Sequence, residues 1–313
     1  MHQPRLSPFW VAALVAAVGT NSASAAITCS AAKVELPDAF AGQQLLVSDG
    51  ARDVTREATY ASSNPAVAKV DAKGYVSAAG DGSAKITVKR GGDTLEVPVA
   101  VKFGTGRRVD FRTEVMPLLS KHGCNAGGCH GKASGQNGFK LSLFGFDTDY
   151  DYAAITKEAR GRRLFPSNPD QSLFLQKGAG TVPHGGGKRL PPDSTDYLVI
   201  KQWMLAGTPA SAPEVPKVVK LRVAPGDFVL QPKQRQQLAV IAEYSDGSTR
   251  DVTRQSEFFS NLDPVAGVDA EGLVKAGEER GEAAVMARHM GYVAVFKAIV
   301  PHGPALAAIP EFQ

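Results

Sequence analysis

The sequence predicts a multidomain protein in which two small β-sandwiches flank a small all-α domain. Two observations carry this prediction: a set of motifs that occurs twice, and a helical segment with paired cysteines between the two copies. At 313 residues, with 43% hydrophobic and 21% charged residues, the chain has room for two or three globular domains. We expect β-domains at 31–103 and 217–301, a helical domain at 107–212 and a cleaved leader at 1–26.

The repeat defines the two β-domains. Asp53-Val-Thr-Arg56 recurs as Asp251-Val-Thr-Arg254, and seventeen residues after the start of each copy Val70-Asp-Ala-Lys-Gly-Tyr-Val is matched by Val268-Asp-Ala-Glu-Gly-Leu-Val. Apolar and polar residues alternate nearby, as in 84–89, with turn-forming residues at short intervals. Because a period of two is typical of half-buried strands, each copy is predicted to form antiparallel strands packed as a sandwich.

These copies resemble the group 2 bacterial immunoglobulin-like domain, through the Asp-Val-Thr, Ser63-Asn-Pro65, Val-Asp-Ala-Lys-Gly-Tyr-Val and Gly80-Asp-Gly-Ser-Ala-Lys-Ile-Thr-Val88 runs. The resemblance implies an immunoglobulin-like fold for both sandwiches. Domains of this family are mostly spacers and surface-binding modules. It therefore also implies a cell-surface or carbohydrate ligand as a possible partner, with a passive spacer as the alternative.

Two capped segments predict the helices of the middle domain. Asp110 precedes an apolar series with helical spacing that leads toward the cysteines, and Pro117 is expected to kink it. Ser194 is predicted to cap a second helix, and Gly207 to end it. The residues expected on the buried faces are Phe111, Val115, Leu118, Leu119, Leu198, Ile200, Trp203 and Leu205.

The run from Cys124 to His130 contains two thiols followed by an imidazole, the pattern used for covalent haem attachment. Each sulfur would form a thioether and His130 would bind the iron. Four residues separate the cysteines where two are usual, and Gly127 and Gly128 supply the slack. We therefore predict one covalent haem c per chain.

The second iron ligand is predicted to be His184. Leu190 stands before Pro191 where small cytochromes commonly have a ligating Met, and leucine cannot bind iron. His184 is the nearest competent side chain in the same loop, with an exposed loop histidine as the alternative. Met204, Met116 and His122 rank lower, the methionines as packing residues and His122 as a surface residue.

Residues 107–212 resemble the cytochrome-c-like domain that large exported proteins of planctomycete bacteria carry beside group 2 immunoglobulin-like domains. The runs that carry the resemblance are Cys124–Gly131, Leu164–Leu173, Pro183–Gly187 and Trp203–Pro209. It implies an exported c-type cytochrome that transfers single electrons to an unknown redox partner. No catalytic signature is found elsewhere, so enzyme activity is not predicted.

Two other readings use the same residues. In a haem-free surface-binding or structural protein, Cys124 and Cys129 would form a disulfide. Alternatively Cys124, Cys129, His130 and His184 would bind zinc. Cys29 is left without a partner in every reading.

The first 26 residues predict where the protein acts. A short basic stretch, the apolar run Phe9–Val18 and the small residues Ala23–Ala25 are typical of a cleaved secretory signal. We therefore expect a periplasmic, cell-surface or secreted protein. No later run approaches the roughly 18 apolar residues of a membrane span.

The net charge of the chain does not indicate a class of binding partner. The net charge of +4 is small and scattered, so no nucleic-acid partner is expected. Two charged clusters are predicted to be solvated surface: the basic run Arg160–Arg163, and the acidic set Asp147, Asp149 and Asp151.

Overall fold

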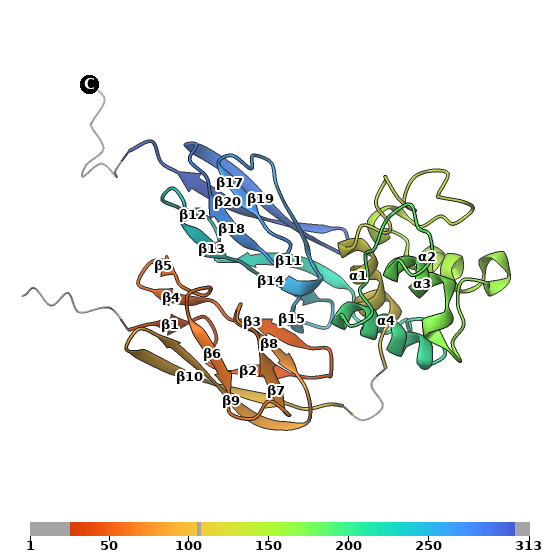
Figure 1. Ribbon diagram of the computed structural model, residues 1–313, viewed down its shortest axis with the longest axis horizontal. Helices are drawn as coiled ribbons and strands as arrows, with labels where there is room; N and C mark the ends of the chain where they lie inside the picture. The colour runs from red at the N-terminus through yellow and green to blue at the C-terminus, as the bar shows by residue number, and fades with distance from the viewer. Residues whose placement is uncertain (1–25, 105–107, 304–313) are drawn as a thin grey trace, which may run out of the picture.

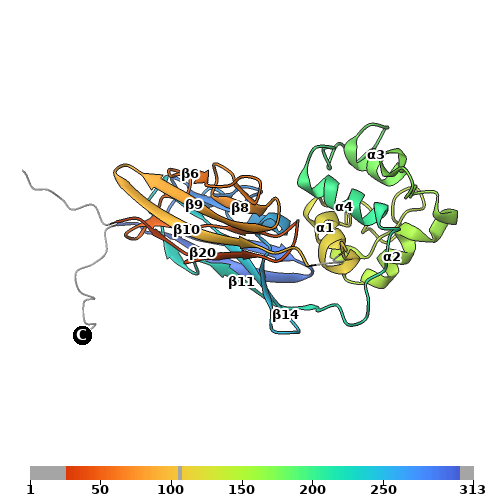
Figure 2. The same ribbon diagram turned by 90° about the horizontal axis from the view of Figure 1, so that it is seen from below.

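The computed structural model of the protein describes residues 26–104 and 108–303. The predicted leader therefore lies outside the described residues except for Ala26. Two β-sandwiches lie side by side, and the segment 108–212 forms a helical part against one end of the pair (Figure 1). The view from below shows the same arrangement, with α1 to α4 beyond the ends of the strands (Figure 2).

The N-terminal sandwich contains strands β1 to β10. Its four-stranded sheet has the order β2-β10-β9-β6, and two three-stranded sheets have the orders β1-β4-β5 and β3-β8-β7. The strands are β1 Thr28–Cys29, β2 Val34–Leu36, β3 Gly42–Gln44, β4 Val47–Asp49, β5 Arg52–Asp53, β6 Thr59–Ser62, β7 Ala68–Val70, β8 Tyr75–Ala78, β9 Gly82–Arg90 and β10 Asp93–Val101. Along β9 the apolar Ala84, Ile86 and Val88 are buried, as the period of two predicts.

The C-terminal sandwich repeats this topology strand for strand. Its sheets have the orders β12-β20-β19-β16, β11-β14-β15 and β13-β18-β17. The strands are β11 Val218–Ala224, β12 Phe228–Val229, β13 Arg235–Gln237, β14 Ala239–Tyr244, β15 Thr249–Asp251, β16 Glu257–Ser260, β17 Ala266–Val268, β18 Leu273–Ala276, β19 Gly281–His289 and β20 Tyr292–Val300, with the 3-10 turn η5 at Thr253–Gln255.

Not every pairing is antiparallel, contrary to the prediction. β2 pairs with β10 in parallel, and β12 pairs with β20 in parallel. Both are short strands that join the edge of a four-stranded sheet, and the chain crosses to the other sheets before it returns. Such an edge strand leaves little trace in the sequence, because alternation of residues does not reveal strand direction.

The middle segment is made of short helices joined by turns. Its elements are η1 Phe111–Val115, α1 Met116–Lys121, η2 Leu143–Gly145, α2 Thr148–Thr156, η3 Glu158–Gly161, η4 Pro169–Gln171, α3 Leu173–Ala179 and α4 Thr195–Leu205. η1 is a π-helix that continues into α1, which has Pro117 in its first turn. The segment has its own apolar core, in which the Phe111 and Trp203 ring centroids lie 5.3 Å apart.

The predicted helix caps are confirmed, and the buried face predicted for the second helix is correct at Ile200 and Trp203 but wrong at Leu198 and Leu205. Asp110 accepts a hydrogen bond from the Thr113 N–H, and Ser194 accepts one from the Tyr197 N–H. In α4, however, Leu198 and Leu205 are exposed rather than buried. They lie seven residues apart on the side opposite Trp203, and the face of α4 that contains Ile200 and Trp203 supplies the core. The buried residues of α4 are Tyr197, Val199, Ile200, Trp203 and Met204.

The predicted fold class is therefore wrong in its central part. The described residues are dominated by twenty strands, and their four α-helices have between six and eleven residues. No distinct all-α cytochrome-c-like domain is found among them. Two capped helices are too general a signal to specify that fold, because the turns that join them carry no periodic pattern.

The tip of the β19–β20 hairpin of the C-terminal sandwich packs against the middle segment. Met290 at its tip packs against the core of the middle segment, and the Arg288 guanidinium lies 3.5 Å from the Phe144 ring centroid. His289 is 2% exposed, its Nδ1 lies 3.4 Å from the Gln255 carbonyl oxygen, and its Nε2 is buried without a partner. Burial lowers the pKa of His289 from 6.5 to about 4.

This burial makes the protein sensitive to acid. Because the unfolded chain binds a proton at His289 more readily, the His289 contribution to stability is complete above pH 6.5 and declines as the pH falls toward 4. The loss amounts to about 3 kcal/mol if the whole shift is expressed. We expect His289→Leu to flatten the decline, measured as the difference in urea unfolding free energy between variant and wild type from pH 7 to 4.5. His302→Leu, at an exposed histidine, should leave the decline unchanged. Equal slopes for His289→Leu and wild type would contradict the prediction.

Candidate functional site

The repeated Asp-Val-Thr-Arg motifs lie where the two sandwiches meet. In each motif the aspartate first fixes its own turn: Asp53 Oδ1 accepts from the Thr55 N–H at 2.9 Å, and Asp251 Oδ1 accepts from the Thr253 N–H at 2.9 Å. This type of turn is a common use of aspartate. It leaves the second carboxylate oxygen of each motif directed toward the other sandwich.

The second oxygens form two reciprocal hydrogen bonds. The Gln237 N–H donates to Asp53 Oδ2 at 2.5 Å, and the Gln44 N–H donates to Asp251 Oδ2 at 2.8 Å. The side-chain amides also match, since Gln44 Nε2 donates to Lys73 O and Gln237 Nε2 donates to Glu271 O, each at 2.8 Å. The two sandwiches are thus related by a local two-fold arrangement, like the partners of an isologous dimer.

Charged side chains surround these hydrogen bonds. Arg254 contacts Asp71 of the other sandwich at 2.9 Å and Glu271 of its own at 2.6 Å, while Arg56 donates to Gln237 Oε1 at 2.8 Å. We define the motif interface as the residues that make these hydrogen bonds and ion pairs between the sandwiches or support them. Its members are Gln44, Asp53, Arg56, Asp71, Lys73, Gln237, Asp251, Arg254, Asp269 and Glu271.

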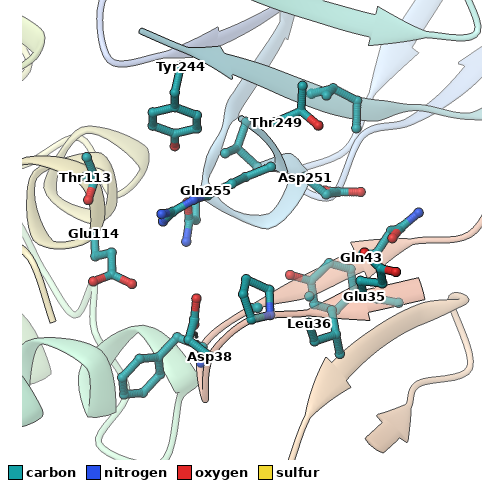
Figure 3. Close-up of a pocket in the computed structure, with 18 of the residues that line it drawn as sticks. Glu35, Leu36, Asp38, Gln43, Thr113, Glu114, Tyr244, Thr249, Asp251 and Gln255 are labelled. Atoms are coloured by element: carbon teal, nitrogen blue, oxygen red, sulfur yellow. Dashed lines mark hydrogen bonds between the residues drawn. The ribbon is translucent and has the colours of Figure 1, made fainter. Parts of the chain in front are cut away.

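A cavity of about 320 Å³ adjoins the motif interface at Asp251. Three parts of the chain line it: Asp38 and Gln43 from the N-terminal sandwich, Glu114 from η1, and Gln255 with its neighbours from the C-terminal sandwich (Figure 3). Its volume lies at the lower end of the range for small-molecule sites, and its side chains offer both donors and acceptors. Burial raises the pKa of Asp251 to about 6.

The structure brings His130 and His184 together. Their ring centroids lie 6.4 Å apart, and their planes differ by 9°. His130 Nδ1 lies 2.9 Å from Phe139 O, and His184 Nδ1 lies 3.0 Å from Gly187 O. Since a carbonyl oxygen only accepts, each Nδ1 carries a proton, and in a neutral imidazole the lone pair is then on Nε2. Burial lowers the pKa of His130, which favours this neutral form.

The cysteines suit haem attachment less well than the histidines. The side chain of Cys124 packs against the core of the middle segment, and burial raises its pKa to about 12. The raised pKa lowers the fraction of reactive thiolate at Cys124, whose side chain is only partly buried. These four residues thus fit a haem only in part, and the function that we propose does not require a haem. Covalent haem at Cys124 and Cys129, with His130 and His184 as iron ligands, stays a prediction.

Neither the disulfide nor the zinc site considered for this loop is formed in the described residues. Cys29, Cys124 and Cys129 are all free thiols, so the Cys124–Cys129 disulfide of the haem-free alternative is not present. Within residues 26–104 and 108–303, no three His, Cys, Asp or Glu side chains are grouped to hold a metal ion, so a four-ligand zinc site is not assembled there.

The lower-ranked ligand candidates have structural surroundings. Met116 and Met204 are fully buried in the core, as predicted. His122 is not a free surface residue, because its Nε2 lies 2.8 Å from Asp196 Oδ2.

Sequence reasoning missed two buried charges that organise this loop. Arg163 was expected in solvent but is 6% exposed, and its guanidinium lies 4.4 Å from the centroid of the Phe139 ring, which in turn contacts His130. Asp151 was also expected in solvent but is fully buried, where its carboxylate accepts from the Ser142 N–H and hydroxyl at 2.5 and 2.6 Å. Burial raises the pKa of Asp151 to about 6. One charge among neighbouring charged residues gives no sequence signal for such burial.

Comparison with known protein families matches one segment of the chain. The model described as "Intimin, immunoglobulin-like domain" matches residues 57–92, which contain β6 to β9 of the N-terminal sandwich. An intimin-type immunoglobulin-like domain is therefore present there. The expected group 2 assignment is shown only at this coarser level. No curated protein matches the chain.

Several solved structures are similar to this chain at low sequence identity. Domains 5-6 of the S-layer protein SbsC share 12% identity, with 88% of this chain and 98% of that chain covered and a TM-score of 0.32. Domains 1-6 of the surface layer protein SbsC share 12% identity over 90% of this chain, which spans 28% of that chain, with a TM-score of 0.25. Extracellular domains 3-5 of Drosophila OTK share 7% identity over 88% of this chain and 59% of that one, with a TM-score of 0.18. At these TM-scores the likenesses carry no functional argument.

The predicted cytochrome function is wrong. The family match falls in a β-sandwich, and the segment expected to be cytochrome-like consists of short helices and turns without a grouped set of metal ligands among its described residues. Electron transfer and a redox partner are therefore not supported. The findings favour the other reading, a haem-free protein built on immunoglobulin-like domains. Of the helices in the described residues, none is long and apolar enough to cross a bilayer.

Proposed function

We propose that the protein is an extracellular or cell-surface protein of the structural and binding class, in which the two sandwiches act as one rigid unit that carries the middle segment. The single observation that supports this most is the reciprocal pair of hydrogen bonds between Asp53, Gln237, Gln44 and Asp251. Each joins a carboxylate of one sandwich to the backbone of the other, and backbone contacts of this kind fix orientation closely. A passive flexible spacer does not need them.

Both sandwiches are also attached to the middle segment. Phe40 from the N-terminal sandwich and Met290 from the C-terminal sandwich pack against its core. The middle segment is thereby held by two points on two different domains, which limits its rotation. Such a unit suits a surface protein that presents a loop-rich region at a fixed angle.

The finer assignments belong to the same proposal. We propose group 2 immunoglobulin-like domains at 31–103 and 217–301, around a segment at 107–212. A cell-surface or carbohydrate ligand stays a prediction. The cavity beside Asp251 is the candidate binding site, because its hydrogen-bond donors and acceptors suit a polar ligand.

Labelling of intact cells tests the proposed location. Lys33, Lys85 and Lys233 have side chains 71%, 61% and 75% exposed, so an amine reagent that does not cross membranes reaches them in the folded protein. In the organism that encodes the chain, we expect labelling of intact cells to equal that of lysed cells, while a cytoplasmic protein is labelled only after lysis. Labelling that requires lysis would contradict a surface location.

A further inference from the structure

One position of the repeat has opposite charges in the two sandwiches, and these two residues contact each other. Lys73 in Val70-Asp-Ala-Lys-Gly corresponds to Glu271 in Val268-Asp-Ala-Glu-Gly. Their side chains form an ion pair across the motif interface. In a two-fold arrangement a residue that meets its own counterpart lies close to the axis. Pairing of identical sandwiches would therefore place two lysines or two glutamates together.

The other charges of the motif interface are the same in both sandwiches. Arg56 corresponds to Arg254 and Asp71 to Asp269, and each arginine faces the aspartate of the other sandwich, at 3.9 Å for Arg56–Asp269 and 2.9 Å for Arg254–Asp71. Arg56 also lies 3.6 Å from Glu271. The side chains that form these ion pairs are thus three cationic and three anionic, while Asp53 and Asp251 accept backbone hydrogen bonds instead.

A pair of like sandwiches loses this balance. Among the ion-pairing side chains, two N-terminal sandwiches would bring four cations to two anions with two lysines at the axis, and two C-terminal sandwiches would bring two cations to four anions with two glutamates at the axis. We infer that the opposite charges of Lys73 and Glu271, here called the charge code, determine which sandwiches associate. They favour association of each sandwich with the unlike sandwich of its own chain and disfavour association with a like sandwich from another copy. Like-charge contacts of this kind are a known means of excluding wrong partners.

Three of the six ion-pairing side chains are largely buried. Those of Arg56, Arg254 and Glu271 are 13%, 19% and 27% exposed, while those of Lys73, Asp71 and Asp269 are 43%, 45% and 46% exposed. Solvent therefore screens the charges of Arg56, Arg254 and Glu271 less than it screens ordinary surface pairs. Arg56 Nη2 and Arg254 Nε are buried without hydrogen-bond partners, so an added cation at position 271 has no spare acceptor there.

Amide hydrogen exchange in the full chain tests the code. The Gln44 and Gln237 N–H groups donate only to carboxylates of the opposite sandwich, so their protection reports directly on the closed pair. We expect Lys73→Glu and Glu271→Lys each to speed exchange at both amides by about ten-fold or more. The double variant restores opposite charges at the axis, and we expect it to exchange more slowly than either single variant. Sedimentation of all variants then shows whether like sandwiches associate between copies.

A matched control is available in the same sandwich. Lys85 and Glu96 form an exposed ion pair on neighbouring strands, so Lys85→Glu makes the same charge change away from the interface and should leave both amides protected. Protected amides in β9 and β10 show that each variant is folded. Wild-type exchange in both single variants, or additive acceleration in the double variant, would overturn the inference. The inference rests on the paired unit proposed above, but exchange is measured in purified protein, so its outcome is independent of the cellular location.

Discussion

Replacing Asp53 by alanine is expected to lower the free energy of unfolding by about 3 kcal/mol, because buried N–H groups are left without an acceptor. Asp53 is 8% exposed and accepts from the Thr55 N–H and hydroxyl on one oxygen and from the Gln237 N–H on the other. The substitution therefore removes both the local turn and one of the two reciprocal bonds between the sandwiches. Urea unfolding followed by circular dichroism measures the loss.

A second substitution at the same position separates the two roles. Asp53→Asn can keep an acceptor for Thr55 but places an amide NH₂ opposite the Gln237 N–H, so only the contact between sandwiches is lost. We expect about half of the destabilisation, together with faster exchange of the Gln237 amide. Asp227→Ala, at an exposed aspartate, serves as the control and should be nearly silent. If Asp53→Ala unfolds like Asp227→Ala, the motif interface does not stabilise the pair.

The repeat revealed the sandwiches because it combined two kinds of local signal. Alternation gave the long strands such as β9, and the Asn-Pro and Asp-Ala-Lys-Gly runs gave the turns between them. The same repeat contained the motif interface, yet its role was not evident. No role is predicted for Asp53 or Arg56, since a sequence does not show that two domains meet face to face.

In the middle segment the local structure was predictable, but the fold class was not. Its caps at Asp110 and Ser194 were readable, because capping depends on neighbouring residues only. Its class was not, because the turns from 122 to 141 have no periodicity and are held by distant groups such as Arg163. The paired cysteines dominated the interpretation although their spacing departed from the usual pattern. A motif with few residues predicts chemistry only where the surrounding fold supports it.

Arg163→Ala is expected to have the largest effect in the middle segment. The buried guanidinium donates to the carbonyl oxygens of Ala154, Glu158 and Gly138 at 2.9, 3.1 and 3.0 Å, and it lies against the Phe139 ring. Loss of these contacts leaves carbonyl groups without donors and a space behind Phe139. We expect a destabilisation of about 3 to 4 kcal/mol, confined at first to the loop that carries His130.

The pKa of His130 provides a readout that a general loss of stability would not change. Its pKa is lowered by burial, by His184 and by the positive charge of Arg163, while its bond to Phe139 O opposes this shift. Removal of Arg163 takes away one charge and loosens the loop, so the pKa of His130 should rise toward its ordinary value, as followed by NMR titration. Arg163→Lys keeps the charge without the planar set of donors, so it should restore part of the pKa shift but little of the stability. Arg162→Ala, at the exposed neighbouring arginine, should change neither quantity. An unchanged His130 pKa in Arg163→Ala would show that the contacts of Arg163 with Phe139 and of Phe139 with His130 do not couple the arginine to the imidazole.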